Sequence, residues 1–536
     1  MPSIYALEDR YFIFAPPLPP FLLTAGIPIE SSSAQKYSQT QHEILRPVDT
    51  RYANMDTIQA DYLVIGAGAM GMAFADTILT DTDKTIAIVD RYARPSGHWT
   101  VAYPYVRLHQ PSAFYGVNSK HLGQDSIDQV GWNKGLCELA SRDEVCSYYD
   151  RVMQQTFLAS GRVTYYPKHE YTGEGTFHSI LTGKTYRAGS ETRIVDATFM
   201  KVKVPSMSPP AYEVASGVQL ITPNDLPSVK RQYNNYTVVG AGKTGVDACL
   251  WLLANGVDPA SITWIMPRDS FFLERSGLQP GPLFAERTQA SLAAINGSIM
   301  AASSVDDLMD RLVACQQLLR LDDNVKPTMF RCATISLAEF EQLKKIQSII
   351  RQGRIVRLEQ QNVTLQHGSY QPAEDTLFVD CSSDALAKLT PVPVFQGNLI
   401  TLQSVRYCQQ VFSAAFIAHV EAAYTDDATR NNLSRVIPHP NEAFDFPLVQ
   451  LQSHLNGLRW NSEPKTYKWL QDARLDWFGS FMPPAPEDPV AAEAFFKEVG
   501  AQIMAVCSKL TELLLAMPEK DVVRAKAQLG DFGLEV

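Results

Sequence analysis

The sequence predicts an α/β fold with two Rossmann-like dinucleotide-binding domains, the second inserted in the first, followed by a mostly helical C-terminal region. Two stretches of the chain each combine a buried-strand pattern, a Gly-x-Gly-x-x-Gly turn and a helical pattern. Strand-like segments after the second stretch are needed to complete the first domain, and apolar residues near the C-terminus follow helical spacing. With 536 residues the chain is too long for one hydrophobic core, which agrees with several domains.

The first stretch, residues 61–90, reads DYLVIGAGAMGMAFADTILTDTDKTIAIVD. Its apolar runs 62–65 and 86–89 are typical of buried parallel strands. The turn between strand and helix carries three glycines, Gly66, Gly68 and Gly71. The first permits a tight turn, the second lets backbone amides approach a pyrophosphate, and the third allows close packing of helix on strand. Asp90 ends the second strand, where an acid accepts hydrogen bonds from an adenosine ribose, so we expect a dinucleotide here.

The second stretch, residues 236–268, reads YTVVGAGKTGVDACLWLLANGVDPASITWIMPR and repeats the pattern. Its turn carries Gly240, Gly242 and Gly245. No acid ends the second strand of this stretch, and Arg268 stands there instead. Arginine pairs bidentately with phosphate oxygens, which is what the 2′-phosphate of NADPH requires. The first turn therefore suits FAD and the second NADPH.

An irregular aromatic segment, residues 89–119, follows the first stretch. It contains Trp99, Phe114, four tyrosines, three prolines and the two histidines His98 and His109, but few charged residues. We expect this segment to form a dry, rigid wall beside the aromatic flavin ring. His98 and His109 are the candidates for a catalytic role, because each can hydrogen-bond to the flavin or tune its reactivity.

The predicted cofactor-binding residues fall into two sets. Those expected to contact FAD are Gly66, Gly68, Ala69, Met70, Gly71, Asp90, Arg91, His98, Trp99, Arg107 and Gln403. Those expected to contact NADPH are Gly240, Gly242, Lys243, Thr244, Gly245 and Arg268. Gln403, with Arg406, precedes a helix predicted over about 409–423, whose N-terminal dipole can face the pyrimidine edge of the flavin. No metal site is predicted, because the histidines and cysteines lack ligand spacing.

With these two motifs the chain resembles the two-dinucleotide-binding-domain flavoproteins, and within them the class B flavin monooxygenases. The Trp99, Tyr103-Pro104 and Arg107 positions match the segment that lies along the flavin in that group. His98 replaces a glycine of the group, and Leu108, His109 and Gln110 replace its usual acid. The histidine of the Baeyer–Villiger fingerprint is absent, since no histidine lies between His178 and His367.

The resemblance implies an FAD-dependent, NADPH-using monooxygenase that oxidises a small organic molecule with dioxygen through a flavin C4a-(hydro)peroxide. In this chemistry NADPH delivers a hydride to the flavin, and the cofactor carries the difficult step. One alternative is an FAD-dependent NAD(P)H reductase or oxidase without oxygen insertion. Another is a non-catalytic protein that holds FAD as a structural or sensing ligand.

Composition excludes other classes of function. A net charge of −10 argues against nucleic acid or an anionic membrane as the main partner. No uninterrupted apolar run reaches the ~18 residues that a transmembrane helix needs. The eight cysteines are scattered and form no CxxC pair, so neither a redox dithiol nor a zinc site is predicted, and we expect reduced thiols in a cytoplasmic setting. Nothing in the sequence indicates an oligomeric state.

Five segments are expected along the chain. They are a poorly structured extension over 1–56, a first part of the FAD domain over 57–232, an NADPH domain with a helical insertion over 233–350, a second part of the FAD domain over 351–424, and a helical region over 425–536. Two helices are expected within the insertion, in 303–321 and 336–353, because each segment has apolar residues at three- and four-residue spacing after a serine start signal.

Overall fold

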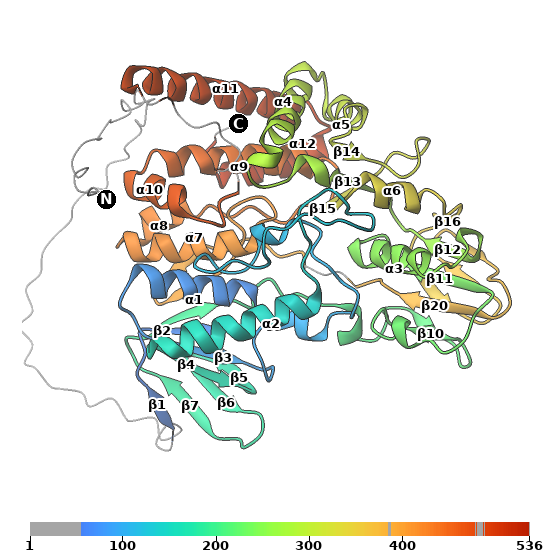
Figure 1. Cartoon of the computed structure of the whole chain (residues 1–536), viewed down its shortest axis with the longest axis horizontal. Helices are drawn as coiled ribbons and strands as arrows, with labels where there is room; N and C mark the ends of the chain where they lie inside the picture. Colours follow the sequence, from blue (N-terminus) through green and yellow to red (C-terminus); the bar gives the residue numbers. More distant parts are fainter. Residues whose placement is uncertain (1–54, 384–386, 478, 480–485, 487, 535–536) are drawn as a thin grey trace, which may run out of the picture.

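The computed structural model describes residues 55–383, 387–477, 479, 486 and 488–534 (Figure 1). The extension predicted over 1–56 lies almost entirely outside the described residues. Within them, no helix is both long and apolar enough to cross a membrane.

The first nucleotide-binding unit is built on a six-stranded sheet. Its order is β21 (Phe395–Gln396), β22 (Leu399–Thr401), β8 (Arg193–Asp196), β2 (Tyr62–Ile65), β3 (Ile86–Asp90) and β4 (Val163–Pro167). All neighbours pair in parallel except β21 with β22. The helices α1 (Ala69–Asp81) and α7 (Gln410–Ala423) lie side by side against this sheet (Figure 1).

The two faces of this sheet are covered by different elements because side chains alternate along each strand. Val64 and Ile88 point into a core shared with α1 and α7. Leu63 and Val89 point to the other face and pack with Phe177 of a second sheet. That sheet has the order β1 (Asp56–Ile58), β7 (Thr185–Ala188), β6 (Thr176–Ser179) and β5 (His169–Gly173).

The second unit repeats the plan with a five-stranded parallel sheet. Its order is β10 (Leu220–Ile221), β20 (Thr376–Asp380), β11 (Asn235–Val239), β12 (Ile262–Ile265) and β16 (Ser348–Ile350), and α3 (Lys243–Ala254) follows β11. A smaller sheet joins its core, in the order β19 (Gly368–Tyr370), β18 (Val363–Leu365), β17 (Ile355–Leu358) and β9 (Glu213–Val214).

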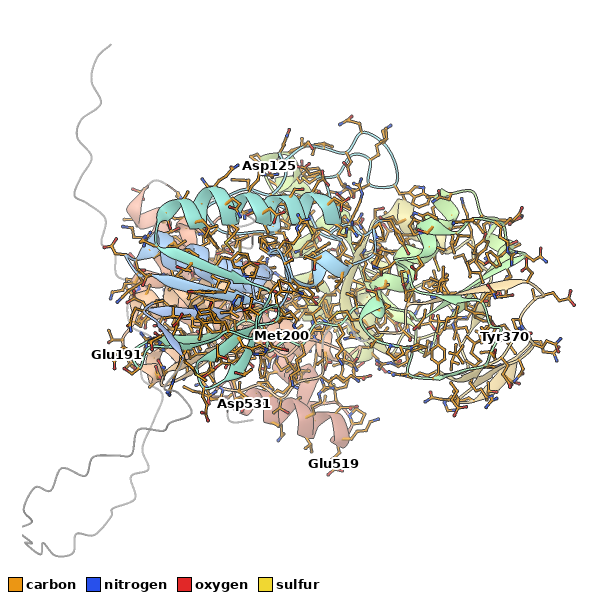
Figure 2. All side chains as sticks on the ribbon, turned by 90° about the horizontal axis from the view of Figure 1, so that it is seen from below. Asp125, Glu191, Met200, Tyr370, Glu519 and Asp531 are labelled. Atoms are coloured by element: carbon orange, nitrogen blue, oxygen red, sulfur yellow. A yellow bond between two sulfur atoms is a disulfide. The ribbon has the colours of Figure 1, made fainter. Side chains whose placement is uncertain are left out.

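The second unit is inserted in the first, as predicted. Strand β8 precedes all of the second sheet and β22 follows it, yet the two strands are paired neighbours. Figure 2 shows Glu191 of the first unit and Tyr370 of the second at opposite ends of the molecule, with Met200, just after β8, between them. The boundary between the second unit and the second part of the first unit was predicted at residue 351. In the structure the chain returns to the first sheet only at β21, because β17 to β20 pair within the second unit.

A further layer of helices packs on α7 and β21 of the first unit (Figure 1). It contains α4 (Ala285–Ala301), α5 (Val305–Ala314), α8 (Asp427–Leu433), α9 (Asp445–Asn461), α10 (Pro464–Asp472), α11 (Pro489–Leu515) and α12 (Glu519–Gly530). Helix α11 packs on both α9 and α4, so the predicted insertion and the C-terminal region share one core (Figure 1). A small sheet, β14 (Leu318–Leu319), β13 (Ser270–Glu274) and β15 (Met329–Ile335), connects this layer to the second unit.

The helix predicted in 336–353 is shorter than expected. Helix α6 (Leu337–Leu343) begins at a capping box on Ser336, as the sequence indicates, but residues 348–350 form strand β16. Thr263 and Ser348 pair across β12 and β16, so hydrogen bonding at the edge of the sheet overrides the helical spacing of the sequence.

Candidate functional site

The first glycine turn has the conformation that its sequence predicts. Gly66 has φ of +101°, a conformation that residues with side chains rarely adopt. A Cβ atom on Gly71 would lie 2.0 Å from the Gly66 carbonyl oxygen, so α1 can pack this closely on β2 only with glycine there. Gly68 is the N-cap of α1 and has no side-chain cap. The first amides of α1, including those of Ala69 and Met70, therefore remain as donors for an anion.

Asp90 lies next to this turn, at the end of β3. One carboxylate oxygen accepts a 2.6 Å hydrogen bond from the Ala67 amide, and the other accepts a 2.7 Å bond from the Tyr92 amide. The side chain is buried, and burial raises the pKa of the carboxyl group. A carboxylate has about four lone-pair positions, so two remain for ribose hydroxyls.

The aromatic segment folds over the first turn. The Ser96 amide donates to the Ala67 carbonyl, and a Cβ on Gly97 would lie 2.9 Å from the Gly68 Cα. Trp99 is buried and donates a 2.8 Å hydrogen bond from Nε1 to the Tyr115 hydroxyl. The segment is thus an ordered aromatic wall beside the turn.

The remaining FAD-set residues of this segment occupy different environments. The ring of His98 stacks on Trp99, with centroids 5.7 Å apart. Burial lowers the pKa of His98 to about 4, so the ring is neutral at pH 7. Arg91 and Arg107 are exposed, and Arg107 donates to the Leu139 carbonyl.

His109 lies where the aromatic segment meets the second unit. Its Nδ1 accepts a 3.0 Å hydrogen bond from the Thr334 amide, which places the ring proton on Nε2. Its carbonyl accepts from Arg275 Nε at 2.9 Å. Burial, and then the charges of Lys243 and Arg275, lower the pKa of His109 to about 3, so it is also neutral at pH 7.

The start of α7 contains two residues that the sequence analysis did not single out. Strand β22 runs parallel to β8 and β2, so α7 begins at the same edge of the sheet as α1. The Oε1 atoms of Gln409 and Gln410 are buried there, and neither has a hydrogen-bond partner among the described residues. The sequence feature that could have identified these glutamines is their position at the start of a predicted helix.

Gln403 itself has a different role from the one predicted. Its side-chain amide pairs in both directions with the backbone of Val392, at 3.2 and 2.8 Å. Within the described residues this amide therefore ties the start of the β21–β22 hairpin to the segment before α7, with one N–H group and one acceptor position engaged. Nearby Arg406 forms a buried ion pair with Asp476 and lies 3.8 Å from the centroid of the Phe412 ring.

The second glycine turn repeats the geometry of the first. Gly240 has φ of +114°, and a Cβ on Gly245 would lie 2.1 Å from the Gly240 carbonyl oxygen. Gly242 is an N-cap without a side-chain cap, and a Cβ there would meet no described atom within 4 Å. The first amides of α3, including that of Thr244, therefore have no side-chain cap and remain as donors.

A charged cluster joins this second turn to the aromatic segment. Lys243 forms an ion pair with Asp247 one helical turn later. The Tyr103 hydroxyl donates a 2.7 Å hydrogen bond to the same carboxylate. Because Tyr103 belongs to the segment that covers the first turn, one loop connects the two predicted nucleotide sites.

Arg268 is positioned at the end of β12 but already has partners. Its guanidinium donates to both carboxylate oxygens of Glu442, at 2.9 and 3.0 Å, and to Asn441 Oδ1 at 3.1 Å. A 2′-phosphate would have to displace Glu442 to reach it. Arg275 is buried and bonds to Asn133, so it is not an alternative.

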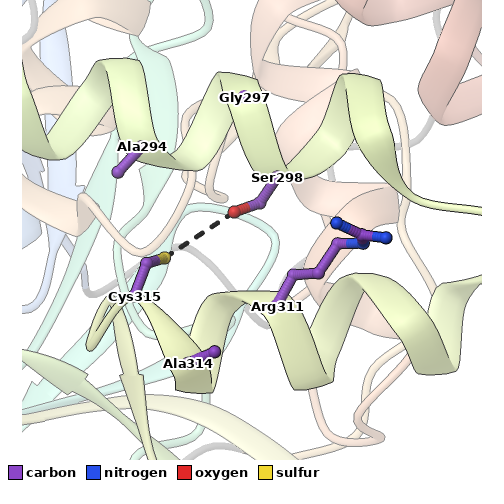
Figure 3. A pocket seen from close by; sticks show the side chains of 6 residues that line it. All are labelled: Ala294, Gly297, Ser298, Arg311, Ala314 and Cys315. Carbon is purple, nitrogen blue, oxygen red and sulfur yellow. Dashed lines mark hydrogen bonds between the residues drawn. The ribbon is translucent and has the colours of Figure 1, made fainter.

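Two hollows in the described surface lie away from the residues predicted to bind FAD and NADPH. One, of about 430 Å³, lies between α4 and α5 (Figure 3). Its lining is Ala294, Gly297, Ser298, Arg311, Ala314 and Cys315. The other, of about 510 Å³, lies beside β1. The lining of neither hollow includes a residue predicted to bind a cofactor.

The expectation that all cysteines are reduced is wrong for one pair. Cys332 in β15 and Cys408, directly before α7, form a disulfide. The two residues are 76 positions apart in the sequence, so no local motif indicates that they pair. Among the described residues the other six cysteines are free.

Comparison with known proteins gives relatives and remote structural likenesses. No protein-family model matches the chain. An uncharacterized protein of Mycobacterium tuberculosis and one of Mycobacterium bovis are each 48% identical over 458 residues, which cover 85% of this chain and 85% of the relative. Among solved structures, cyclohexanone monooxygenase from Rhodococcus sp. Phi1 bound to NADP⁺ is 12% identical, with a TM-score of 0.44, over 69% of this chain and 84% of that chain. A flavin-containing monooxygenase from Stenotrophomonas maltophilia is 15% identical, with a TM-score of 0.40, over 69% of this chain and 98% of that chain.

Proposed function

We propose that this chain, which belongs to the same protein family as the mycobacterial relatives, is a flavin-dependent oxidoreductase that binds FAD at the first glycine turn and NADPH at the second. The observation that carries the proposal is the repeated turn. Each turn combines a glycine of positive φ, a glycine that no larger residue can replace and an uncapped helix start at the end of a parallel strand. Such helix starts bind phosphate groups.

The residues around the first turn fit FAD. We assign the pyrophosphate to the backbone amides of Gly68, Ala69 and Met70, because the helix start has no side-chain cap, and the adenosine ribose to Asp90. The helix dipole of α7 favours negative charge at its N-terminus, where Gln409 and Gln410 have buried oxygens to satisfy. These oxygens can accept hydrogen bonds from N–H groups of a bound ring, which gives them the partners they lack.

The residues around the second turn fit a phosphorylated nucleotide. Lys243 stands at the first position of α3, beside amides that have no side-chain cap. Asp247 and Tyr103 hold that lysine and tie it to the aromatic wall. When both cofactors are bound, NADPH supplies a hydride and FAD passes the electrons on. His109 stays neutral in this region and fixes the wall to β15 through Thr334.

The finer proposal is a monooxygenase that inserts one atom of dioxygen into a small organic molecule. It is supported by the likeness of the motifs around Trp99, Tyr103 and Arg107 to the class B flavin monooxygenases, and by the buried aromatic wall that excludes water. A reductase without oxygen insertion is the second candidate, and the disulfide directly before α7 favours it.

A direct experiment tests the proposal and separates the two candidates. Purified protein is expected to be yellow, to contain one FAD per chain and to oxidise NADPH faster than NADH. Candidate small molecules are then supplied with labelled dioxygen, and the products are analysed by mass spectrometry. Label in a product identifies a monooxygenase, whereas NADPH oxidation with no label in any product identifies a reductase or oxidase. Protein that binds neither nucleotide would overturn the proposal.

A further inference from the structure

The Cys332–Cys408 disulfide lies at the edge where the two units and the helical layer meet. Cys408 directly precedes Gln409, the N-cap of α7, and therefore stands at the edge of the first sheet that also carries the first glycine turn. Cys332 belongs to β15, two residues before Thr334, whose amide is bonded to His109. The sulfur pair thus adjoins both the proposed ring end of the FAD site and the aromatic wall.

Both cysteines adopt an unusual backbone conformation. Cys332 has φ of +58° and Cys408 has φ of +50°, which is the left-handed region that favours glycine. Residues held in that region concentrate at functional sites, where the surrounding structure enforces the conformation. Two such residues, from segments far apart in the sequence, meet here through their side chains.

His439 supplies a third reactive group. One ring nitrogen of His439 and the sulfurs of Cys332 and Cys408 all lie within 4.8 Å of one another. Its Nδ1 is buried and has no hydrogen-bond partner among the described residues. Arg331 and His109 are the titratable groups that act on it from β15 and the aromatic segment. Burial lowers the pKa of His439 to about 3, so its ring is neutral at pH 7, and its unpaired nitrogen can accept a hydrogen bond from a thiol of the reduced pair.

The free cysteines lack this combination. Cys249 and Cys381 are fully buried, and burial raises the pKa of each thiol well above its usual range, which suppresses the thiolate. Cys315 is half-buried and contacts Ser298 at 3.6 Å. In the described part of the chain, only the Cys332–Cys408 pair has two sulfurs and an imidazole together.

We propose that Cys332 and Cys408 form a redox-active pair, with the His439 ring as hydrogen-bond acceptor for the reduced thiols, that exchanges electrons with small thiols and with the reduced flavin. In the thiol reaction, one thiolate of a small dithiol attacks a sulfur of the disulfide, and the S–S bond breaks to give a mixed disulfide. The second thiolate of the reagent displaces the remaining cysteine. The chain gains two electrons and two protons as two thiols, and the dithiol leaves as a disulfide. The part that involves flavin rests on the proposed function, with NADPH as the source of the electron pair.

The first experiment uses dithiothreitol on the folded full-length chain without nucleotides. Thiols are blocked with N-ethylmaleimide before and after treatment, and labelled cysteines are located by mass spectrometry. The treated protein is expected to gain two labels, at Cys332 and Cys408, and a reduced sample that is reoxidised in air before labelling is expected to gain none. A pair that resists reduction until the chain is unfolded would overturn the proposal. Stoichiometric zinc in the isolated protein, lost in C332S, would also overturn it in favour of a metal site.

The variants separate reactivity from structure. In the control variant C315S the gain of two labels is expected to remain, whereas C408S loses the gain. If C408S fails to fold, the labelling of the wild-type chain after dithiothreitol treatment still decides whether the pair is redox-active.

The second experiment distinguishes failure of this inference from failure of the proposed function. FAD-loaded protein receives NADPH under anaerobic conditions, and flavin bleaching and labels are followed together. Bleaching with two added labels supports electron transfer to the pair. Bleaching without added labels would overturn the pair's place in the electron path and leave the proposed function intact. Absence of bleaching would contradict the proposed function, while the dithiothreitol result still decides whether the pair is redox-active.

Discussion

Single glycines decide whether each helix can start where a phosphate would bind. The third glycine of each turn is required by the carbonyl oxygen of the first glycine, five residues earlier, and this local spacing is why the sequence alone locates both turns. The partners of Arg268 and Cys332 come from segments 174 and 76 residues away, and no local pattern contains that information. Prediction therefore succeeded for the turns and missed these contacts.

Replacing Gly71 or Gly245 by alanine tests the two turns separately. Each new Cβ would collide with a backbone carbonyl, at 2.0 and 2.1 Å, and overpacking of this kind costs about 1–3 kcal/mol. We expect G71A to lose FAD, and G245A to keep FAD but lose NADPH binding, as measured by absorbance and by calorimetry. The control is G457A in α9, where a Cβ meets no described atom within 4 Å and folding is expected to be unharmed. Equal nucleotide binding by G71A and the wild type would contradict the assignment.

The lowered pKa values of five histidines determine how the free energy of unfolding depends on pH. Burial lowers the pKa of each, to about 4 for His98, His419 and His454 and to about 3 for His109 and His439. Unfolded histidine has a pKa of about 6.5, so below that pH the unfolded chain binds more protons than the folded chain. The free energy of unfolding therefore falls as pH drops from about 6.5 towards 4, by about 1.4 kcal/mol per pH unit for each such histidine.

Thermal melting between pH 7.5 and 5 measures this effect. The melting temperature is expected to decrease below pH 6.5, and the decrease is expected to be smaller in the double variant H98N/H454N than in the wild type. A melting temperature that stays constant down to pH 5 would show that these side chains are not held neutral in the folded chain.

At the level of elements, the segment before α9 controls access to the end of β12. Glu442 forms an ion pair with Arg268 and therefore competes with a 2′-phosphate for this arginine. We expect E442Q to lower the KM for NADPH, and R268A to raise it roughly 10- to 100-fold, since a charge-assisted hydrogen bond contributes about 1.5–3 kcal/mol. The KM for NADH is expected to change little in either variant, because NADH lacks the phosphate.

Steady-state kinetics with both nucleotides measures the change in preference. R311A, which removes a half-exposed arginine paired with Asp307 on α5, is the control for loss of a positive charge. If R268A keeps the wild-type preference for NADPH, another residue binds the phosphate, and the sequence-based assignment of Arg268 is wrong.

Across the whole molecule, Arg275 joins three parts of the chain. Its buried guanidinium bonds to the carbonyl of His109 in the aromatic wall, to Asn133 and to the carboxylate of Glu339 on α6. Replacement by methionine would leave Glu339 without this partner and would leave three acceptors, the carbonyls of His109 and Thr334 and Asn133 Oδ1, without this donor, which costs about 3–5 kcal/mol for a buried pair. We expect R275M to lower the urea midpoint strongly, whereas the double variant R275M/E339Q recovers part of the loss. No recovery would show that Glu339 is not the coupled partner.

The inserted arrangement of the two units also orders events during synthesis of the chain on the ribosome. All strands of the five-stranded sheet emerge together, from Leu220 to Asp380, so this unit is able to fold while translation continues. The six-stranded sheet has to wait for β22, and the start of α7 emerges later still. A nascent chain that stalls before residue 399 would therefore carry a finished site for one nucleotide and an unfinished site for the other.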